Sequence, residues 1–297
     1  MSPFPIVGIG ASAGGVEALE ALFRPMPARP GMAFVVVTHL GPRHESMLAE
    51  IIARHTAMPA HPIRDGDAVA INHIYVLRQE ASLTIADGRL RLIEPSATNR
   101  ERNPIDIFFS ALADDQGEAA IGIVLSGGGS DGTLGIKAIK ERGGLTLAQV
   151  TDGNIAPQFS GMPSTAIASG LVDLALPTAA MAGKLVAYAR GFGGDGAITA
   201  EPGGDDGSKS AHREICQILL NQVGHDFANY KEPAFFRRVR RRMRILQLIE
   251  IESYIECLRQ DAGRSARSSS TRSVMISLTT RSRQFCAESS DACASSS

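Results

Sequence analysis

The sequence predicts an α/β fold, built as a doubly wound, mostly parallel sheet that carries an antiparallel hairpin. Over residues 4–190, short apolar runs alternate with segments whose apolar residues recur at helical spacing. Strands are expected at 6–9, 33–38, 120–125 and 145–149. Because parallel strands need a crossover between them, usually a helix, this alternation predicts a sheet covered by helices on both faces.

The segments between these runs predict the covering helices. Helices are expected from residue 16 onward and, further along the chain, over 44–55, 106–114, 133–142 and 177–190. Residues 68–94 instead carry alternating apolar and polar residues, and Asp87-Gly88 within them is a strong signal for a hairpin turn. We therefore expect residues 68–94 to form an antiparallel appendage to the sheet.

Composition changes after the α/β region and divides the chain into four parts. Residues 1–190 form the expected α/β domain, and the glycine-rich, acidic stretch 191–210 has little to bury, which predicts a flexible linker. Residues 211–262 predict a small all-α segment, in which 237–244 holds six arginines. The serine- and arginine-rich stretch 263–297 predicts a disordered or non-native tail.

Bulk composition narrows the class of protein. The chain has 297 residues and a formal net charge of −1, so no overall basic charge points to nucleic acid. Its four cysteines form no CxxC pair, which predicts neither a metal site nor a disulfide framework. Since the apolar run near the N-terminus is too short for a signal peptide or a membrane span, we expect a cytoplasmic protein that does not insert into membranes.

Three residues with reactive side chains lie at the carboxyl ends of predicted strands: Ser12, His39 and Asp131. In a doubly wound sheet those ends converge on one crevice, so residues distant in sequence can meet there. The three types match a nucleophile, a general base and an acid that orients the base. Each also has a simpler interpretation, as an N-capping serine, a histidine that ends a strand or a turn aspartate.

Backbone N–H groups beside Ser12 are suited to a developing oxyanion, because the start of a helix leaves such groups unpaired. We expect these donors at Ala13 and, in the loop before Asp131, at Gly128.

Of two other interpretations of the glycine-rich turn, the sequence rejects one and disfavours the other. Residues 10–14 (GASAG) satisfy the G-x-S-x-G pattern of α/β-hydrolases, but that fold places several strands before the serine and the acid before the histidine. A dinucleotide site needs an acidic residue at the end of the second strand, where this chain has 38–40 (THL).

Five motifs follow one another along residues 5–190: 9–15 (IGASAGG), 38–40 (THL), 102–106 (RNPID), 125–132 (LSGGGSDG) and 161–163 (GMP). In these motifs, residues 5–190 resemble the catalytic domain of the chemotaxis protein-glutamate methylesterases. The resemblance implies an enzyme without metal or cofactor that hydrolyses glutamate γ-methyl esters on chemoreceptors, and many members also deamidate receptor glutamines. It assigns the catalytic roles to Ser12, His39 and Asp131. Gly128 is a departure, since the family usually has methionine there.

Residues 211–260 are similar to the N-terminal helical subdomain of chemoreceptor glutamate methyltransferases, through 224–231 and 236–243 (FRRVRRRM). The chain therefore resembles methylesterase–methyltransferase fusions. The resemblance gives the arginines an acidic partner in the methylation region of the receptor, and the residues expected to bind it are Arg237, Arg238 and Arg241.

The second resemblance ends after 273–285, and no S-adenosylmethionine-binding unit follows. We expect a truncation, for which a frameshift is one explanation, and no methyltransferase activity.

The resemblances imply acyl transfer on the cytoplasmic domain of a methyl-accepting chemoreceptor, with a histidine kinase or another chemosensory protein as a further partner. The alternative is a catalytically idle scaffold that docks on the receptor or the kinase.

Overall fold

A computed structural model of the chain describes residues 4–38, 42–77, 82–93, 103–151, 157–192, 205–223, 227 and 232–264. The chain forms two compact units, Met1–Ala197 and Ile198–Ser297. Each unit is described by itself.

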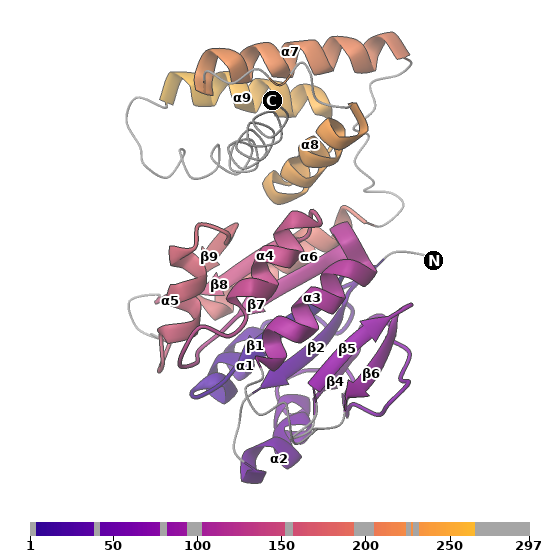
Figure 1. The fold of residues 1–297 in the computed structure, drawn as a ribbon, viewed down its shortest axis with the longest axis vertical. Coiled ribbons are helices and arrows are strands. Elements are labelled where there is room, and N and C mark those ends of the chain that lie inside the picture. The colour runs from indigo at the N-terminus through magenta and orange to yellow at the C-terminus, as the bar shows by residue number, and fades with distance from the viewer. Residues whose placement is uncertain are drawn as a thin grey trace, which may run out of the picture. The chain divides into compact units, whose positions relative to one another are not determined.

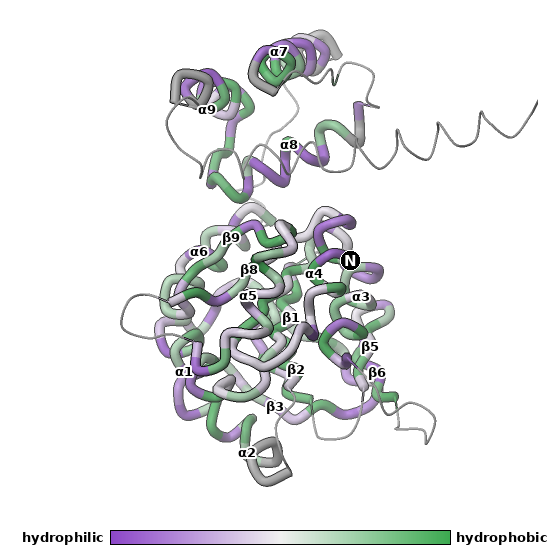
Figure 2. Tube along the Cα trace, turned by 60° about the vertical axis from the view of Figure 1, so that its left-hand side comes forward, coloured by the Kyte–Doolittle hydropathy of each residue, from purple (hydrophilic) through white to green (hydrophobic). Residues whose placement is uncertain are grey.

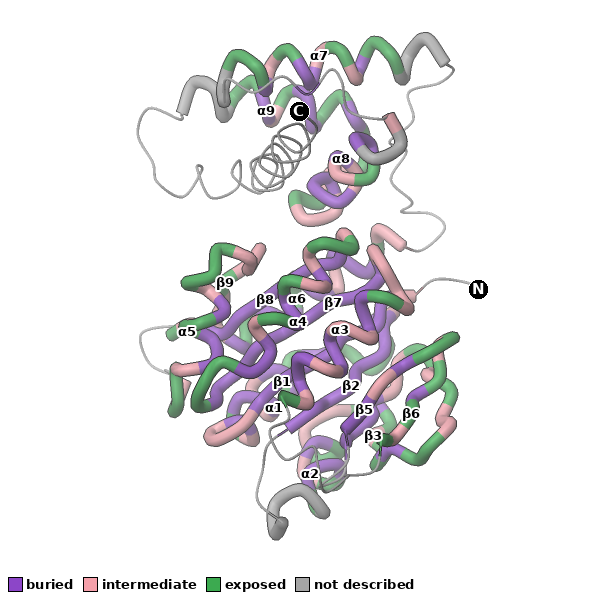
Figure 3. The backbone as a smooth tube through the Cα atoms, in the orientation of Figure 1, coloured by how far each residue is buried: buried purple, intermediate pink, exposed green. Residues whose placement is uncertain are grey.

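The first unit is built on a parallel sheet with the strand order β3-β4-β2-β1-β7-β8-β9 (Figure 1). Its strands are β1 (Ile6–Ala11), β2 (Ala33–Thr38), β3 (Ala60–Pro62), β4 (Ile74–Val76), β7 (Ala120–Val124), β8 (Leu145–Gln149) and β9 (Leu174–Leu176). Strands β1, β2, β7 and β8 are buried along their whole length (Figure 3), as expected for apolar strands covered on both faces. The predicted parallel α/β sheet is therefore confirmed.

Helices cover both faces of this sheet. They are α1 (Gly15–Phe23), α2 (Pro42–Ala53), α3 (Pro104–Gln116), α4 (Thr133–Glu141), α5 (Gly161–Ala168) and α6 (Thr178–Arg190). Helix α3 packs directly on β1, because Gly10 has no side chain: a Cβ there would lie 2.4 Å from the side chain of Ile105. A Cβ on Gly15 of α1 would instead meet the side chain of Ala11, which points to the opposite face from Gly10. The fold is doubly wound, as predicted.

The antiparallel hairpin is present but shorter than expected. Strands β5 (Ser82–Ala86) and β6 (Arg89–Ile93) pair across Asp87 and Gly88, which have φ angles of 52° and 69°. Two positive φ angles are typical of the tight turns that favour Asp-Gly. The prediction that 68–94 is antiparallel throughout is wrong, because β4 pairs parallel with β2 inside the main sheet. An alternating run as short as β4 does not distinguish a hairpin strand from a sheet strand.

The second unit contains three described helices, α7 (Asp205–Val223), α8 (Glu232–Leu246) and α9 (Ile251–Arg264), which share an apolar core. The all-α segment is confirmed, but the predicted linker 191–210 is wrong in its last part, because α7 begins inside it. Aspartates are favourable in the first turn of a helix, which allows an acidic stretch to start one. Helix α9 also ends two residues beyond the predicted boundary at 262, and the tail from 265 lies outside the described residues.

Helix α8 is hydrophilic over much of its length (Figure 2). Among the described residues, no helix is long and apolar enough to cross a bilayer.

Candidate active site

The strand order places the candidate residues at a topological switch point. Strand β1 pairs with β2 on one side and with β7 on the other. The chain runs from β1 through β2 to β3 and β4, and later crosses back to β7, β8 and β9. Ligands bind at such a reversal, beside the carboxyl ends of the strands. Ser12 follows β1 directly, and Asp131 lies in the loop after β7.

The turn that carries Ser12 is fixed by the backbone. The N–H of Ser12 donates to the carbonyl of Ser126 (2.9 Å), and the N–H of Gly15 donates to the carbonyl of Ser12 (2.9 Å). The N-cap of α1 is Gly14, at φ 70°, without a side-chain capping bond. The simpler interpretation of Ser12 as an N-capping serine is therefore wrong, and its side chain is not needed to start the helix.

Two backbone N–H groups are left available beside Ser12. A peptide unit is planar and trans, so its N–H points opposite to its C=O. The bond from Gly15 to the Ser12 carbonyl thus fixes the direction of the Ala13 N–H, and the bond from Met162 to the Gly127 carbonyl (2.9 Å) fixes that of Gly128. Across the described parts of the chain, neither the Ala13 nor the Gly128 N–H has a hydrogen-bond partner.

The loop that carries Gly128 lies directly against the serine. A Cβ on Gly127 would be 3.0 Å from the Cβ of Ser12 and 2.1 Å from the sulfur of Met162, so only glycine fits there without rearrangement. At Gly128 a Cβ would meet no atom of the described residues within 4 Å, and φ is not positive. The backbone at 128 therefore does not depend on glycine, and a side chain of the kind usual in the family is compatible with it.

The Asp131 carboxylate is held by backbone donors. Oδ2 accepts from Ile105 N (3.2 Å), and Oδ1 accepts from Asp106 N (3.0 Å) and Gly132 N (2.8 Å). Two of these donors belong to the first turn of α3, which packs on the end of β1 at Gly10. The Asp131 carboxylate is therefore oriented at the same sheet edge that carries Ser12. The turn-aspartate interpretation is correct in part, since Asp131 caps α3 rather than its own helix α4.

Asp106 is a second buried carboxyl at this position that we did not predict. Its Oδ1 accepts from Gly135 N (2.7 Å) in the first turn of α4, so α4 receives a carboxylate from α3, and α3 receives that of Asp131 from the loop before α4. Burial raises the pKa of the Asp106 carboxyl above its usual value, backbone N–H bonds oppose the rise, and the charge of Asp131 adds to it. The sequence did point to this carboxyl, because Asp106 is the last residue of the motif RNPID.

His39 lies outside the described residues. Strand β2 nevertheless leads the chain to this edge, because Thr38 pairs in register with Ala11, and these two residues directly precede His39 and Ser12.

The predicted receptor-binding arginines differ in exposure. Arg237 is exposed and Arg238 is half-buried, whereas Arg241 is only 7% exposed. Arg241 is therefore less available to a partner than Arg237 and Arg238, and receptor binding by these residues stays a prediction.

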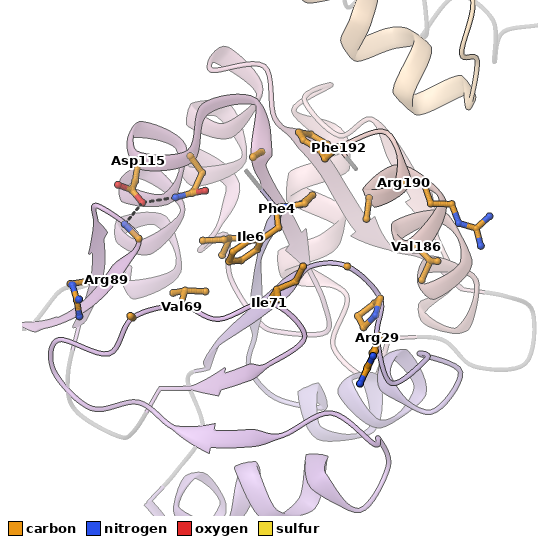
Figure 4. Close-up of a pocket in the computed structure, with 18 of the residues that line it drawn as sticks. Phe4, Ile6, Arg29, Val69, Ile71, Arg89, Asp115, Val186, Arg190 and Phe192 are labelled. Carbon is orange, nitrogen blue, oxygen red and sulfur yellow. Dashed lines mark hydrogen bonds between the residues drawn. The ribbon is translucent and has the colours of Figure 1, made fainter. Parts of the chain in front are cut away.

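The described residues around Ser12 form no metal centre, and the large pocket described next is not lined by Ser12. No group of three or more potential metal-ligating side chains is found among the described residues. A pocket of about 1180 Å³ opens at the amino-terminal edge of the sheet, with Phe4 and Ile6 at its centre (Figure 4). Ser12 and Asp131 do not line it, so it is not the candidate active site.

Comparisons with known proteins match two parts of the chain to two protein families. The family model for CheB methylesterase matches residues 7–185, and the model for the all-alpha domain of CheR methyltransferase matches residues 211–268. The crystal structure of the Thermotoga maritima CheB methylesterase catalytic domain is similar, with a TM-score of 0.55, 27% identity, and coverage of 62% of this chain and 97% of that one.

Two curated relatives are similar over 61% and 78% of this chain. A protein-glutamate methylesterase/protein-glutamine glutaminase of Burkholderia orbicola is 34% identical over 183 residues, which cover 61% of this chain and 53% of the relative. An uncharacterized 104.1 kDa protein of Rhodobacter capsulatus is 32% identical over 251 residues, 78% of this chain and 26% of that protein. The chain thus spans about half of the methylesterase relative and about a quarter of the longer protein. This chain belongs to the CheB methylesterase family.

Proposed function

We propose that the chain hydrolyses γ-methyl esters of glutamate on the cytoplasmic domain of chemoreceptors. The observation that carries the proposal is the surrounding of Ser12: the serine lies at the switch point of the sheet, with two partner-free backbone N–H groups beside it among the described residues. Such an arrangement suits acyl transfer, in which a serine attacks a carbonyl and backbone donors hold the negative charge that forms on its oxygen.

In the proposed first step, the Ser12 hydroxyl attacks the ester carbonyl while His39 accepts its proton. The bond from Oγ to the carbonyl carbon forms, and the charge moves to the carbonyl oxygen, held by the N–H groups of Ala13 and Gly128. Asp131 orients the imidazole and stabilises its protonated form. The carbon–methoxy bond then breaks, and His39 returns the proton to the leaving oxygen, which releases methanol.

In the second step, water attacks the acyl-serine with His39 again as base. The product is a free glutamate side chain, and Ser12 regains its proton. A glutamine side chain can follow the same path with ammonia as the leaving group, which makes deamidation part of the proposal. The reaction requires no metal or cofactor and takes place in the cytoplasm, where the receptor's methylation region lies.

In the second unit, Arg237 and Arg238 are the proposed contacts to an acidic receptor segment, since opposite charges steer and orient association. A histidine kinase or another chemosensory protein is the proposed further partner.

The test is methanol release from a methylated receptor cytoplasmic fragment. Ser12→Ala should lower turnover by at least about 10³-fold, as expected for loss of the nucleophile. The variant should fold normally, because the bonds that fix this turn come from the backbone of Ser12. Ser164→Ala, at an exposed serine of α5, is the matched control and should remain fully active.

Near-normal release by Ser12→Ala would refute the proposal. If neither the unmodified chain nor the variant released methanol while both bound the fragment, the alternative of a docking scaffold would replace it.

A further inference from the structure

Ser126 is a fully buried polar residue at the end of β7, and each of its polar atoms is used. Its N–H donates to Oε1 of Gln149 (2.8 Å), and its carbonyl accepts from the N–H of Ser12 (2.9 Å). Its hydroxyl donates to the carbonyl of Ala13 (2.9 Å). A buried network in which all groups are satisfied is rigid, since breaking any bond leaves an unpaired polar group in a low-dielectric interior.

The hydroxyl connects the two backbone segments that carry the available N–H groups. In the first segment, Ser126 bonds to the backbone on both sides of the Ser12–Ala13 peptide unit. Its carbonyl accepts from Ser12 N, and its hydroxyl donates to Ala13 O. Toward the second segment, its Oγ accepts from Phe159 N (3.0 Å), and the Phe159 carbonyl in turn accepts from Gly127 N (2.9 Å). Gly127 immediately precedes the peptide unit that bears the Gly128 N–H.

The packing around Ser126 leaves this arrangement little freedom. A Cβ on Gly14 would lie 2.8 Å from the Ser126 hydroxyl, so the turn approaches the hydroxyl as closely as a glycine allows. Without the hydroxyl, Ala13 O and Phe159 N each lose a hydrogen-bond partner. The two backbone segments that carry the Ala13 and Gly128 N–H groups then lose the residue that connects them.

We propose that Ser126 is a positioning residue whose hydroxyl sets the relative placement of the Ala13 and Gly128 N–H groups. Ser126 does not itself touch the substrate. The inference rests on the proposed function, because it concerns the site that would hold the oxyanion. Donors of this kind act only when they are already aimed at the charge that develops in the transition state. Loss of the hydroxyl should therefore weaken transition-state stabilisation more than substrate binding.

The experiment compares Ser126→Ala with Ser126→Thr, which retains a hydroxyl, and with the control Ser169→Ala. Ser169 also donates its hydroxyl to a backbone carbonyl, that of Ala166 in α5. Methanol release gives kcat and KM, and thermal unfolding reports on folding. Phenylboronic acid is the probe of the oxyanion site, because it adds to a serine hydroxyl as a tetrahedral anion.

We expect Ser126→Ala to lower kcat by about 30- to 100-fold, somewhat less than outright removal of an oxyanion donor, with KM within about twofold. The dissociation constant of phenylboronic acid should rise by a similar factor. Ser126→Thr should recover most of the turnover, and Ser169→Ala should match the unmodified chain.

A kcat within about twofold of normal in Ser126→Ala would overturn the inference, as would a fall in kcat with unchanged boronate affinity. A folded Ser126→Thr chain that is as slow as Ser126→Ala would also overturn it. In each of these cases the unmodified chain is active, so the proposed function stands. An inactive unmodified chain would instead overturn the proposed function, and the inference with it.

Discussion

Substitution of Gly127 by alanine tests whether the loop after β7 is held against Ser12. The added methyl group would lie 2.1 Å from the sulfur of Met162 and 3.0 Å from the Cβ of Ser12. Met162 is buried, at 1% exposure, so its side chain has little space to move into. The mutation should therefore disturb both the packing and the placement of the nucleophile.

The expected loss of stability is small and measurable. Overpacking a buried site costs about 1–3 kcal/mol, and the flexible thioether at Met162 places this case in the lower half of that range. Replacement of glycine by alanine also lowers the conformational entropy of the unfolded chain. This stabilises the folded chain by about 0.4–1 kcal/mol, because φ at Gly127 is not positive and alanine can adopt it. A net loss of about 1 kcal/mol should lower the Tm of the first unit by about 2–4 °C.

The effect on activity should be larger than the effect on stability. A displacement of about 1 Å at a reacting group can cost about 10²-fold in rate, so we expect kcat to fall by about that factor. Gly183→Ala is the matched control, since a Cβ at this exposed position of α6 would meet no described atom within 4 Å, and it should be as active and at least as stable as the unmodified chain. If Gly127→Ala equalled Gly183→Ala in Tm and methanol release, the proposed packing of this loop on Ser12 would be refuted.

The two buried carboxyls give two further predictions. Asp131→Asn places an amide NH₂ against backbone donors that now serve both carboxylate oxygens, and methanol release should fall by about 10⁴-fold; a loss of less than tenfold would contradict the orienting role. Because the pKa of Asp106 is raised, the folded chain binds the proton of this carboxyl more tightly than the unfolded chain does. Protonated Asp106 therefore contributes its full stabilisation below the pKa of the unfolded chain, and this contribution is lost as pH rises through the pKa of the folded chain. Urea unfolding between about pH 3 and 7 should therefore show the unmodified chain losing stability relative to Asp106→Asn as pH rises, and the opposite slope would be inconsistent with burial as the dominant cause.

Elements with long, uniform patterns could be predicted from the sequence, and short ones could not. Strands β1, β2, β7 and β8 each have five or six buried residues, which makes an apolar run visible. Strands β3 and β9 have three residues each, too few to show a period. Helix α5 consists mostly of small residues with Pro163 in its first turn, so no apolar stripe marks it as a helix.

The candidate site likewise contains residues that the sequence indicates and residues whose part depends on tertiary contacts. Ser12 and Asp131 could be found because the chemistry-bearing residues of an open α/β fold follow its strands. The positioning role proposed for Ser126 could not be found in this way, because it depends on hydrogen bonds to residues 113 and 33 positions away in the sequence. The burial of Arg241 was also missed, since a run of arginines predicts a solvated helix face and tertiary packing decides which members are covered.

The most direct test of the central claim is to locate the residue that becomes covalently modified. A fluorophosphonate phosphonylates an activated serine with loss of fluoride, and mass spectrometry of the digested chain identifies the labelled peptide. We expect one adduct on Ser12, loss of methanol release in proportion to labelling, and no adduct in Ser12→Ala. An adduct on a different residue, or an active chain that is never labelled, would contradict the assignment of Ser12 as the nucleophile.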